Sequence, residues 1–124
     1  MQHECEDRIP VHGGLDAPVD RRVPLKERRR FLAEAERLPR VRVSRADIST
    51  VHRIADGTLS PLEGFMGESA WQRVLDERVV LFGGGRYAWT IPLSLPVSDA
   101  EAAALRAGGS AAHCSESGEV IAIL

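Results

Sequence analysis

The segment at residues 58–67, Thr-Leu-Ser-Pro-Leu-Glu-Gly-Phe-Met-Gly, constrains the fold of this chain more than any other. A proline and two glycines fix its course, while Leu62, Phe65 and Met66 supply bulky apolar side chains. Such side chains are costly to leave in water, so a flexible connector does not account for the segment. We expect the loop to fold back on the domain or to present an apolar face. The hypothesis is a docking surface made by Leu62, Phe65 and Met66, partly exposed or covered by a second copy.

Length and composition indicate one soluble domain. The chain has 124 residues, of which 44% are hydrophobic and 27% charged, and no apolar run approaches the roughly 20 residues that cross a bilayer. Residues 1–8 are polar and charged, so we expect a flexible tail, a cytoplasmic location and no membrane partner. A net charge of −2 argues against a general binder of polyanions, and the two cysteines predict reduced thiols rather than a disulfide framework.

Helical spacing of apolar residues alternates with shorter extended segments along the chain. Predicted helices cover residues 24–38, 44–57, 68–77 and 98–105, and predicted strands cover 40–43, 79–82, 87–97, 111–114 and 120–124. Ser44 and Ser98 each stand three positions before an acidic residue, the pattern of a capping box. Pro92 and Pro96 interrupt the longest strand, which places it at an edge or a bulge. The order predicts an α+β domain built around a small β-barrel or curled sheet with peripheral helices.

Histidine and cysteine side chains that a metal ion could use are few and scattered. Those that could be imagined as a cluster are His3, Cys5, His12, His113 and Cys114, five of the six histidines and cysteines in the chain. Their spacings do not repeat a C-x-x-C or H-x-x-x-H arrangement, so we predict no metal site. His113 and Cys114 are neighbours on a predicted strand and would point to opposite faces, which argues against a Cys–His nucleophile. We therefore assign no catalytic, metal-binding or cofactor-binding residue.

Two glycine-rich stretches are typical of turns. The first is His12, Gly13 and Gly14, and a histidine beside paired glycines is best explained by a hydrogen bond to the backbone. The second is the run of three glycines at residues 83–85. A phosphate-binding loop would need a helix N-terminus after the glycines, whereas a strand is predicted there. We predict a structural turn at the first stretch and a hairpin turn at the second.

Four stretches of the chain carry recognisable motifs. They are His12-Gly13-Gly14 followed by Arg21-Arg22-Val23, the S-P-L-x-G-F-M segment within residues 54–66, residues 89–98 beginning Trp-Thr-Ile-Pro-Leu, and residues 121–124. In order and spacing they resemble the N-terminal PUA-like domain of ATP sulfurylase (sulfate adenylyltransferase). The resemblance implies a PUA-like domain over residues 9–124. It also implies that the catalytic domain is absent, because the family's downstream Q-x-R-N-P-x-H motif and its later H-x-x-H signature do not occur here.

The resemblance implies a non-catalytic module that packs or docks within a sulfate adenylyltransferase, which makes adenylyl sulfate and pyrophosphate from ATP and sulfate. The implied partner is the ATP sulfurylase catalytic domain, in cis or in trans, or a second copy of the chain. In that family the loop at residues 58–67 lies close to the junction with the catalytic domain. The implied parent activity is that of a nucleotidyltransferase in sulfate assimilation.

An alternative is a stand-alone PUA-like domain that binds RNA or a nucleotide through its basic first half. The basic residues there are Arg21, Arg22, Lys26, Arg28, Arg29, Arg30, Arg37, Arg40, Arg42 and Arg45. This alternative rests on fold analogy and is the less favoured of the two. Arginines gathered on one face, with a steep salt dependence of binding, would support it.

Overall fold

The computed structural model describes residues 11–124, so the flexible tail predicted at residues 1–8 lies outside the described residues. The helical elements are η1 (His12–Gly14), η2 (Leu25–Glu27), α1 (Arg28–Ala35), α2 (Arg45–Ala55), α3 (Glu68–Glu77) and α4 (Asp99–Ala104). The strands are β1 (Arg40–Arg42), β2 (Val79–Phe82), β3 (Gly85–Ala88), β4 (Ala112–Cys114) and β5 (Val120–Ile123). The predicted α+β class is confirmed.

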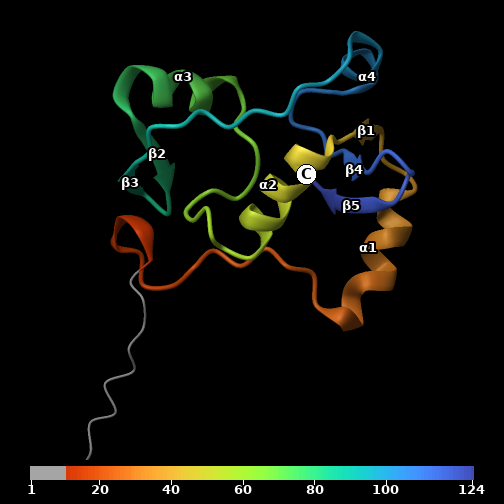
Figure 1. The fold of residues 1–124 in the computed structure, drawn as a ribbon, viewed down its shortest axis with the longest axis horizontal. Helices are drawn as coiled ribbons and strands as arrows, with labels where there is room; N and C mark the ends of the chain where they lie inside the picture. The colour runs from red at the N-terminus through yellow and green to blue at the C-terminus, as the bar shows by residue number, and fades with distance from the viewer. Residues whose placement is uncertain (1–10) are drawn as a thin grey trace, which may run out of the picture.

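The strands of the described residues form two sheets that lie on either side of α2 (Figure 1). One sheet has the order β1-β4-β5, in which β1 runs parallel to β4 and β5 runs antiparallel to it. The other is the β2–β3 hairpin. Every residue of β4 is buried, because this strand lies between two others and is covered on both faces. β5 is consequently an edge strand.

A first apolar cluster joins α1 to the three-stranded sheet. Ala35 packs with Ala112 and Cys114, and all three are buried. Leu38 and Val120 pack around them. Small residues at the centre bring the helix close to the sheet, and the larger side chains close the rim of the contact.

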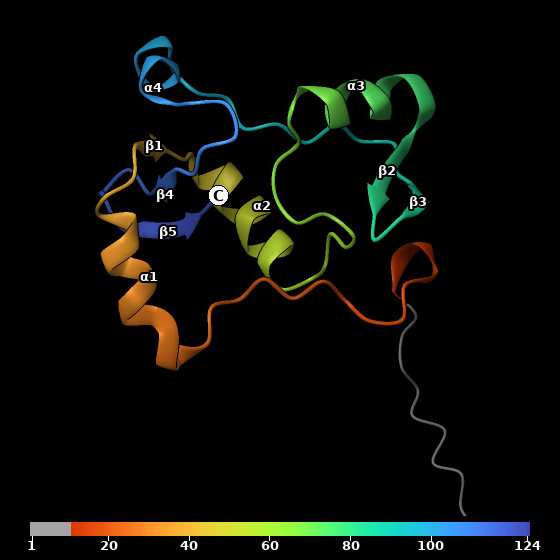
Figure 2. The same ribbon diagram turned by 180° about the vertical axis from the view of Figure 1, so that it is seen from behind.

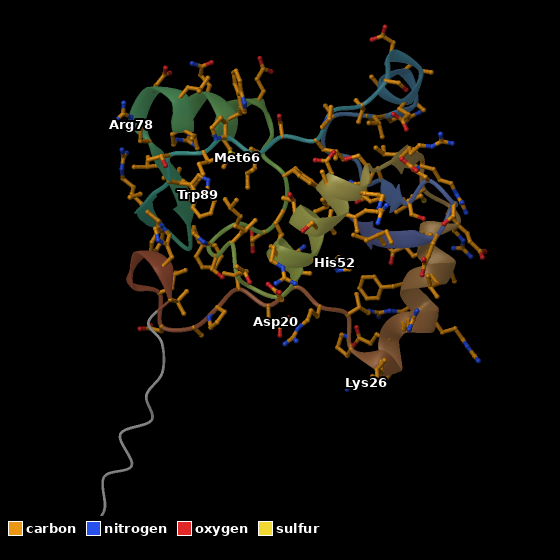
Figure 3. The ribbon with its side chains drawn as sticks, viewed as in Figure 1. Asp20, Lys26, His52, Met66, Arg78 and Trp89 are labelled. Carbon is orange, nitrogen blue, oxygen red and sulfur yellow. The ribbon has the colours of Figure 1, made fainter. Side chains whose placement is uncertain are left out.

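A second apolar cluster lies between α3, the β2–β3 hairpin and the loop at residues 58–67. Its buried members are Leu62, Val74 and Val80, with Met66 and Trp89 packed against them (Figure 3). Val74 comes from α3 and Val80 from β2, and Leu62 is the buried contribution of the loop, which also supplies Met66. The loop therefore folds back on the domain, as its apolar content predicted.

A capping box begins α4 and also ties this helix to the first sheet. Ser98 Oγ accepts the N–H of Glu101 at 3.2 Å, and Glu101 Oε2 accepts the N–H of Ser98 at 2.9 Å. The other carboxylate oxygen accepts the N–H of Arg42 on β1 at 2.7 Å. These backbone donors, that of Arg42 first, lower the pKa of Glu101. The carboxylate therefore stays ionised to a lower pH than that of an isolated glutamate.

We expect Glu101→Ala to free α4 from β1, because it removes the acceptor for two backbone N–H groups at once. The amide of Arg42 should lose protection in hydrogen exchange, while the β4–β5 pairing keeps its protection. Glu116→Ala, in the turn between β4 and β5, is the control and should leave both unchanged. Unaltered protection of the Arg42 amide in Glu101→Ala would contradict the view that Glu101 holds α4 against β1.

The long strand predicted over residues 87–97 is wrong. β3 ends at Ala88, and the following residues stay extended without entering a sheet ladder. Their backbone groups bond elsewhere: Trp89 donates its N–H to the carbonyl of Arg78 at 2.8 Å, and Leu93 accepts the N–H of Met66 at 2.7 Å. Two prolines in the segment remove donors that a ladder would need.

Candidate docking site

The loop at residues 58–67 divides its apolar side chains between core and surface. Leu62 is 6% exposed and belongs to the second cluster, so it forms no part of an exposed face. Phe65 and Met66 are half-buried. The Phe65 ring lies 6.1 Å from the ring of His113, measured between centroids, which joins the loop to the central strand of the first sheet. Of the predicted docking residues, Phe65 and Met66 remain partly accessible while Leu62 holds the loop in place.

The stretch at residues 12–14 is the short turn η1, which closes onto the β2–β3 hairpin. Gly13 has a φ of +76°, and a Cβ added there would lie 2.9 Å from a ring carbon of Tyr87. His12 Nε2 lies 3.1 Å from the carbonyl oxygen of Ala88. Glycine is therefore needed both for the backbone conformation and for the close approach, and the histidine contacts backbone.

Residues 18–24, which we call the strap, run from the hairpin side of the domain past α2 to α1 (Figures 1 and 2). Two hydrogen bonds fix the strap to the middle of the molecule. Val19 donates its N–H to Ser60 Oγ at 2.8 Å, and Arg21 donates its N–H to the carbonyl of Ala55 at 2.9 Å. Ser60 is buried and belongs to the loop at residues 58–67. This loop therefore also holds the strap in place.

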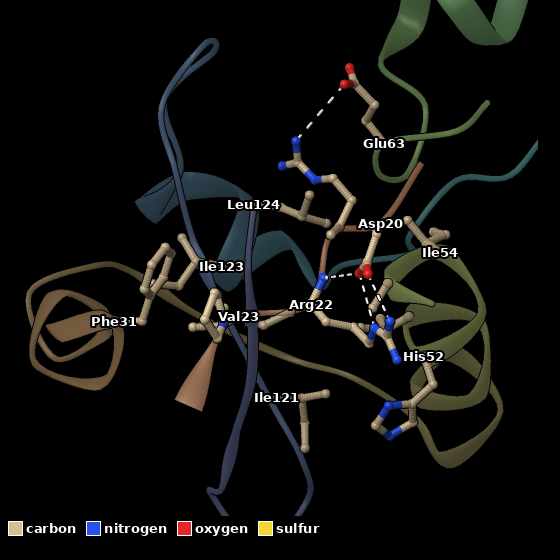
Figure 4. A pocket seen from close by; sticks show the side chains of 15 residues that line it. Asp20, Arg22, Val23, Phe31, His52, Ile54, Glu63, Ile121, Ile123 and Leu124 are labelled. Carbon is tan, nitrogen blue, oxygen red and sulfur yellow. Dashed lines mark hydrogen bonds and ion pairs between the residues drawn. The ribbon is translucent and has the colours of Figure 1, made fainter. Parts of the chain in front are cut away.

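An apolar slot lies between the strap, α2, α1 and β5 (Figure 4). Its volume is about 560 Å³. The apolar side chains that line it include Val23, Phe31, Ile54, Ile121, Ile123 and Leu124. A smaller groove of about 280 Å³ adjoins it between α1 and β5. Sequence reasoning missed this slot, since its walls come from four separate parts of the chain.

The charged groups at the slot pair with one another. Arg22 forms an ion pair with Asp20 at 2.7 Å, and Arg21 lies 3.9 Å from Glu63. The hydrogen bonds of the Arg22 side chain and backbone hold the pKa of Asp20 at about 2, so the pair stays ionised. Figure 3 shows Asp20 on the strap beside α2, which carries His52. The slot thus has an apolar interior and a rim whose charges compensate each other.

The side chains that could bind a metal ion lie apart from one another in the described residues. Within residues 11–124, no three histidine, cysteine or acidic side chains gather where a metal ion could be held. Cys114 is buried against the backbone of β4, and its sulfur lies 3.8 Å from the carbonyl of Ala112. His3 and Cys5 lie outside the described residues. Most of the surface that lines the slot is apolar, and Asp20, Arg21, Arg22, His52 and Glu63 supply its polar part.

Basic side chains of the first half are partly compensated by local acids. Three short-range ion pairs are Arg22 with Asp20, Arg30 with Glu27, and Arg53 with Asp56. Each pair joins residues two or three positions apart. These arginines therefore neutralise acidic groups of their own segment, in the strap, α1 or α2. Arg40 and Arg42 are exposed at the two ends of β1, and Arg45 begins α2.

His113 is buried at the centre of β4 and is 4% exposed. Its Nδ1 has no hydrogen-bond partner within the described part of the chain. Burial lowers the pKa of His113 below its ordinary value of 6.5, because the charged ring would lose its hydration. The folded domain therefore holds a neutral imidazole against Phe65.

We expect acid to destabilise the domain through His113. Well above pH 6.5 the ring is neutral in both states, and as the pH falls through that value the unfolded chain binds the proton more readily than the folded chain. The free energy of unfolding should fall as the pH drops toward the lowered pKa, by at most about 1.4 kcal/mol per pH unit. Urea unfolding of the natural chain and of His113→Phe across this range measures the difference. An identical pH dependence in both proteins would contradict the expectation.

Fold and slot together define a small α+β domain of two sheets with an apolar slot at one sheet edge. The chain belongs to the PUA-like domain family, whose family model matches residues 9–124. The predicted resemblance to the PUA-like domain of ATP sulfurylases is confirmed by relatives of that name. No helix within residues 11–124 is both long and apolar enough to cross a bilayer.

Two relatives are sulfate adenylyltransferases. That of Pyropia yezoensis is 50% identical over 115 residues, which are 93% of this chain and 26% of the relative. That of Nostoc punctiforme is 36% identical over 124 residues, all of this chain and 30% of the relative. Among solved structures, the hexameric APS kinase from Thiobacillus denitrificans matches with a TM-score of 0.79 and 26% identity, covering 94% of this chain and 22% of that one. The chain thus spans between a fifth and a third of the length of these proteins.

Proposed function

We propose that this chain is a non-catalytic PUA-like module of a sulfate adenylyltransferase and that it packs against the catalytic domain of that enzyme. The parent reaction is the formation of adenylyl sulfate and pyrophosphate from ATP and sulfate, in cytoplasmic sulfate assimilation. The observation that carries the proposal is the 50% identity to the Pyropia yezoensis sulfate adenylyltransferase over 93% of this chain. The charges at the rim of the slot pair with one another, which fits a packing role.

The docking surface proposed for this role is the accessible part of the loop at residues 58–67. Phe65 and Met66 are half-buried and stand on a segment whose course is fixed by buried Leu62. Apolar side chains on a segment of fixed course lose little conformational freedom when a partner covers them, which favours binding. The role of Leu62 in this surface is to position the loop.

The solution mass of the chain tests the proposal. Light scattering would be recorded on the chain alone and mixed with the Pyropia yezoensis enzyme lacking its own matching region. We expect a complex of the two and a gain in adenylyl sulfate formation. Phe65→Ala should weaken the complex, whereas Phe82→Ala, another half-buried phenylalanine on the β2–β3 hairpin, should not. A stable homo-oligomer that ignores the catalytic part would overturn the proposal.

Binding of RNA is the second candidate, and the exposed arginines at and beside β1 favour it. Arg40, Arg42 and Arg45 follow one another closely along an exposed edge. Binding of a single-stranded oligonucleotide that weakens steeply with salt would support this candidate, because the contacts would be to phosphates. Salt-independent or absent binding would reject it.

A further inference from the structure

A buried histidine lies beside the proposed docking surface. His113 is the middle residue of β4, which lies between β1 and β5, and it is 4% exposed. Its ring faces that of Phe65, with the two centroids 6.1 Å apart and the ring planes tilted by 43°. Its Nδ1 has no hydrogen-bond partner within residues 11–124. The contact therefore depends on a neutral imidazole, because a proton would place an unpaired charge in a buried site.

The segment that packs against His113 is anchored at its two ends and free between them. Leu62 before it is buried, and Met66 after it donates its N–H to the carbonyl of Leu93 at 2.7 Å. Between these anchors, residues 63–65 make no backbone hydrogen bond within the described chain. The strand β4, by contrast, is paired on both sides. Residues 63–65 are therefore the part that can move when the imidazole requires hydration.

Charged groups on the surrounding elements offer no counter-charge to a protonated His113. These groups are Arg40 and Arg42 of β1, Glu63 of the loop, and Arg45, Asp47, His52 and Arg53 of α2, which lies between the sheets (Figure 1). The arginines of β1 are exposed and alternate with a buried residue that faces the same way as His113. Glu63 pairs with Arg21 at 3.9 Å (Figure 4), and Asp47 accepts the hydroxyl of Ser44 at 2.8 Å. Burial is consequently the cause that lowers the pKa of His113.

We propose that residues 63–65, which we call the latch, release Phe65 when His113 is protonated, so that acid weakens the proposed docking surface. The inference rests on the proposed function and adds its regulation. As the pH falls below 6.5, the open form gains over the closed form, because only the open form hydrates the charged ring. One proton is involved, so the ratio of open to closed chains changes by at most about tenfold per pH unit. Attraction between an imidazolium and the Phe65 ring acts in the other direction, and the lowered pKa of His113 means that burial outweighs it.

Fluorine NMR of the whole chain tests the latch. The three phenylalanines, Phe31, Phe65 and Phe82, are replaced biosynthetically by para-fluorophenylalanine, and the titration of His113 is followed through its ring carbons. We expect the Phe65 signal to move toward that of a solvent-exposed ring, with the same midpoint as His113 and below pH 6.5. Phe31 and Phe82 are also half-buried and serve as internal controls that should keep their signals. A Phe65 signal that does not follow His113 would overturn the proposal.

Two substitutions assign the effect to one histidine. His113→Leu removes the titrating group and keeps an apolar side chain, so the Phe65 signal should stay at its closed position at every pH. His52→Gln removes an exposed histidine of α2 and should leave the titration of Phe65 unchanged. A shift of Phe65 that persists in folded His113→Leu would reject the latch. If that variant does not fold, the natural chain still decides: a joint shift of all three fluorine signals would mark unfolding of the whole domain and overturn the proposal.

Docking separates this inference from the proposed function. The dissociation constants of the natural chain and of His113→Leu are measured at each pH with the Pyropia yezoensis enzyme lacking its own matching region, so that titration of that enzyme cancels in their ratio. We expect a ratio near one at neutral pH and a rise of up to about tenfold per pH unit once the latch opens. A ratio that stays near one while Phe65 moves would overturn the regulatory role. Absence of a complex at every pH would overturn the proposed function alone, and the fluorine titration would then decide whether the latch exists.

Discussion

Replacing Leu62 by alanine is expected to lower the free energy of unfolding by about 2–5 kcal/mol. Leu62 is 6% exposed and packs with Val74 and Val80, so the truncation removes apolar contacts and leaves a cavity between α3, β2 and the loop. Urea unfolding followed by the fluorescence of Trp89, which packs against this cluster, measures the change. Because a small domain is stable by only about 5–15 kcal/mol, the loss is a large part of the total.

The same substitution at an exposed leucine serves as the control, because it removes a leucine without removing a buried side chain. Leu75 lies on α3 with 48% of its surface exposed, and Leu75→Ala should change the free energy of unfolding by no more than about 0.5 kcal/mol. Equal effects of the two substitutions would show that Leu62 is not part of the core. That result would also restore Leu62 to the docking surface predicted from the sequence.

Replacing Gly57 by alanine is the second change with a large expected effect. Gly57 has a φ of +84°, and an added Cβ would lie 2.7 Å from the Cβ of Pro18 and 3.3 Å from the carbonyl oxygen of Val19. The left-handed conformation alone costs a residue with a side chain about 1–2 kcal/mol. The clash would then push the strap away from α2. We expect a loss above about 2 kcal/mol and faster proteolysis within the strap.

Gly84→Ala provides the control for this prediction. Gly84 also has a positive φ, +78°, yet an added Cβ there would meet no atom within 4 Å. Its substitution reports the conformational cost alone, and the excess cost at Gly57 reports the close approach of the strap. Equal losses at the two positions would contradict the proposed contact between Gly57 and the strap.

The helix starts could be predicted because their causes are local. Ser98 and Glu101 stand three positions apart, and their reciprocal hydrogen bonds need only one turn of chain. Ser44 likewise accepts the N–H of Asp47. The helix predicted from residue 24 begins instead as η2, and α1 proper starts at Arg28, so its first turn is tighter than an α-helix.

The predicted strand over residues 87–97 failed because a strand needs a partner. The alternation of apolar and polar residues there is the same whether or not a neighbouring strand lies alongside. The N–H of Met66, from a distant part of the sequence, donates a hydrogen bond to the carbonyl of Leu93. A single contact from a loop leaves the segment extended without forming a ladder.

By itself the sequence determined the α+β class, the starts of α2 and α4, and the return of an apolar loop to the body of the domain. These follow from local hydrogen bonds and from the cost of exposing apolar surface. Only the tertiary structure decided that Leu62 is buried while Phe65 and Met66 stay partly accessible. It alone also brought the strap, α1, α2 and β5 together around one slot. Both features depend on which distant segments meet, and no local pattern of residues specifies that choice.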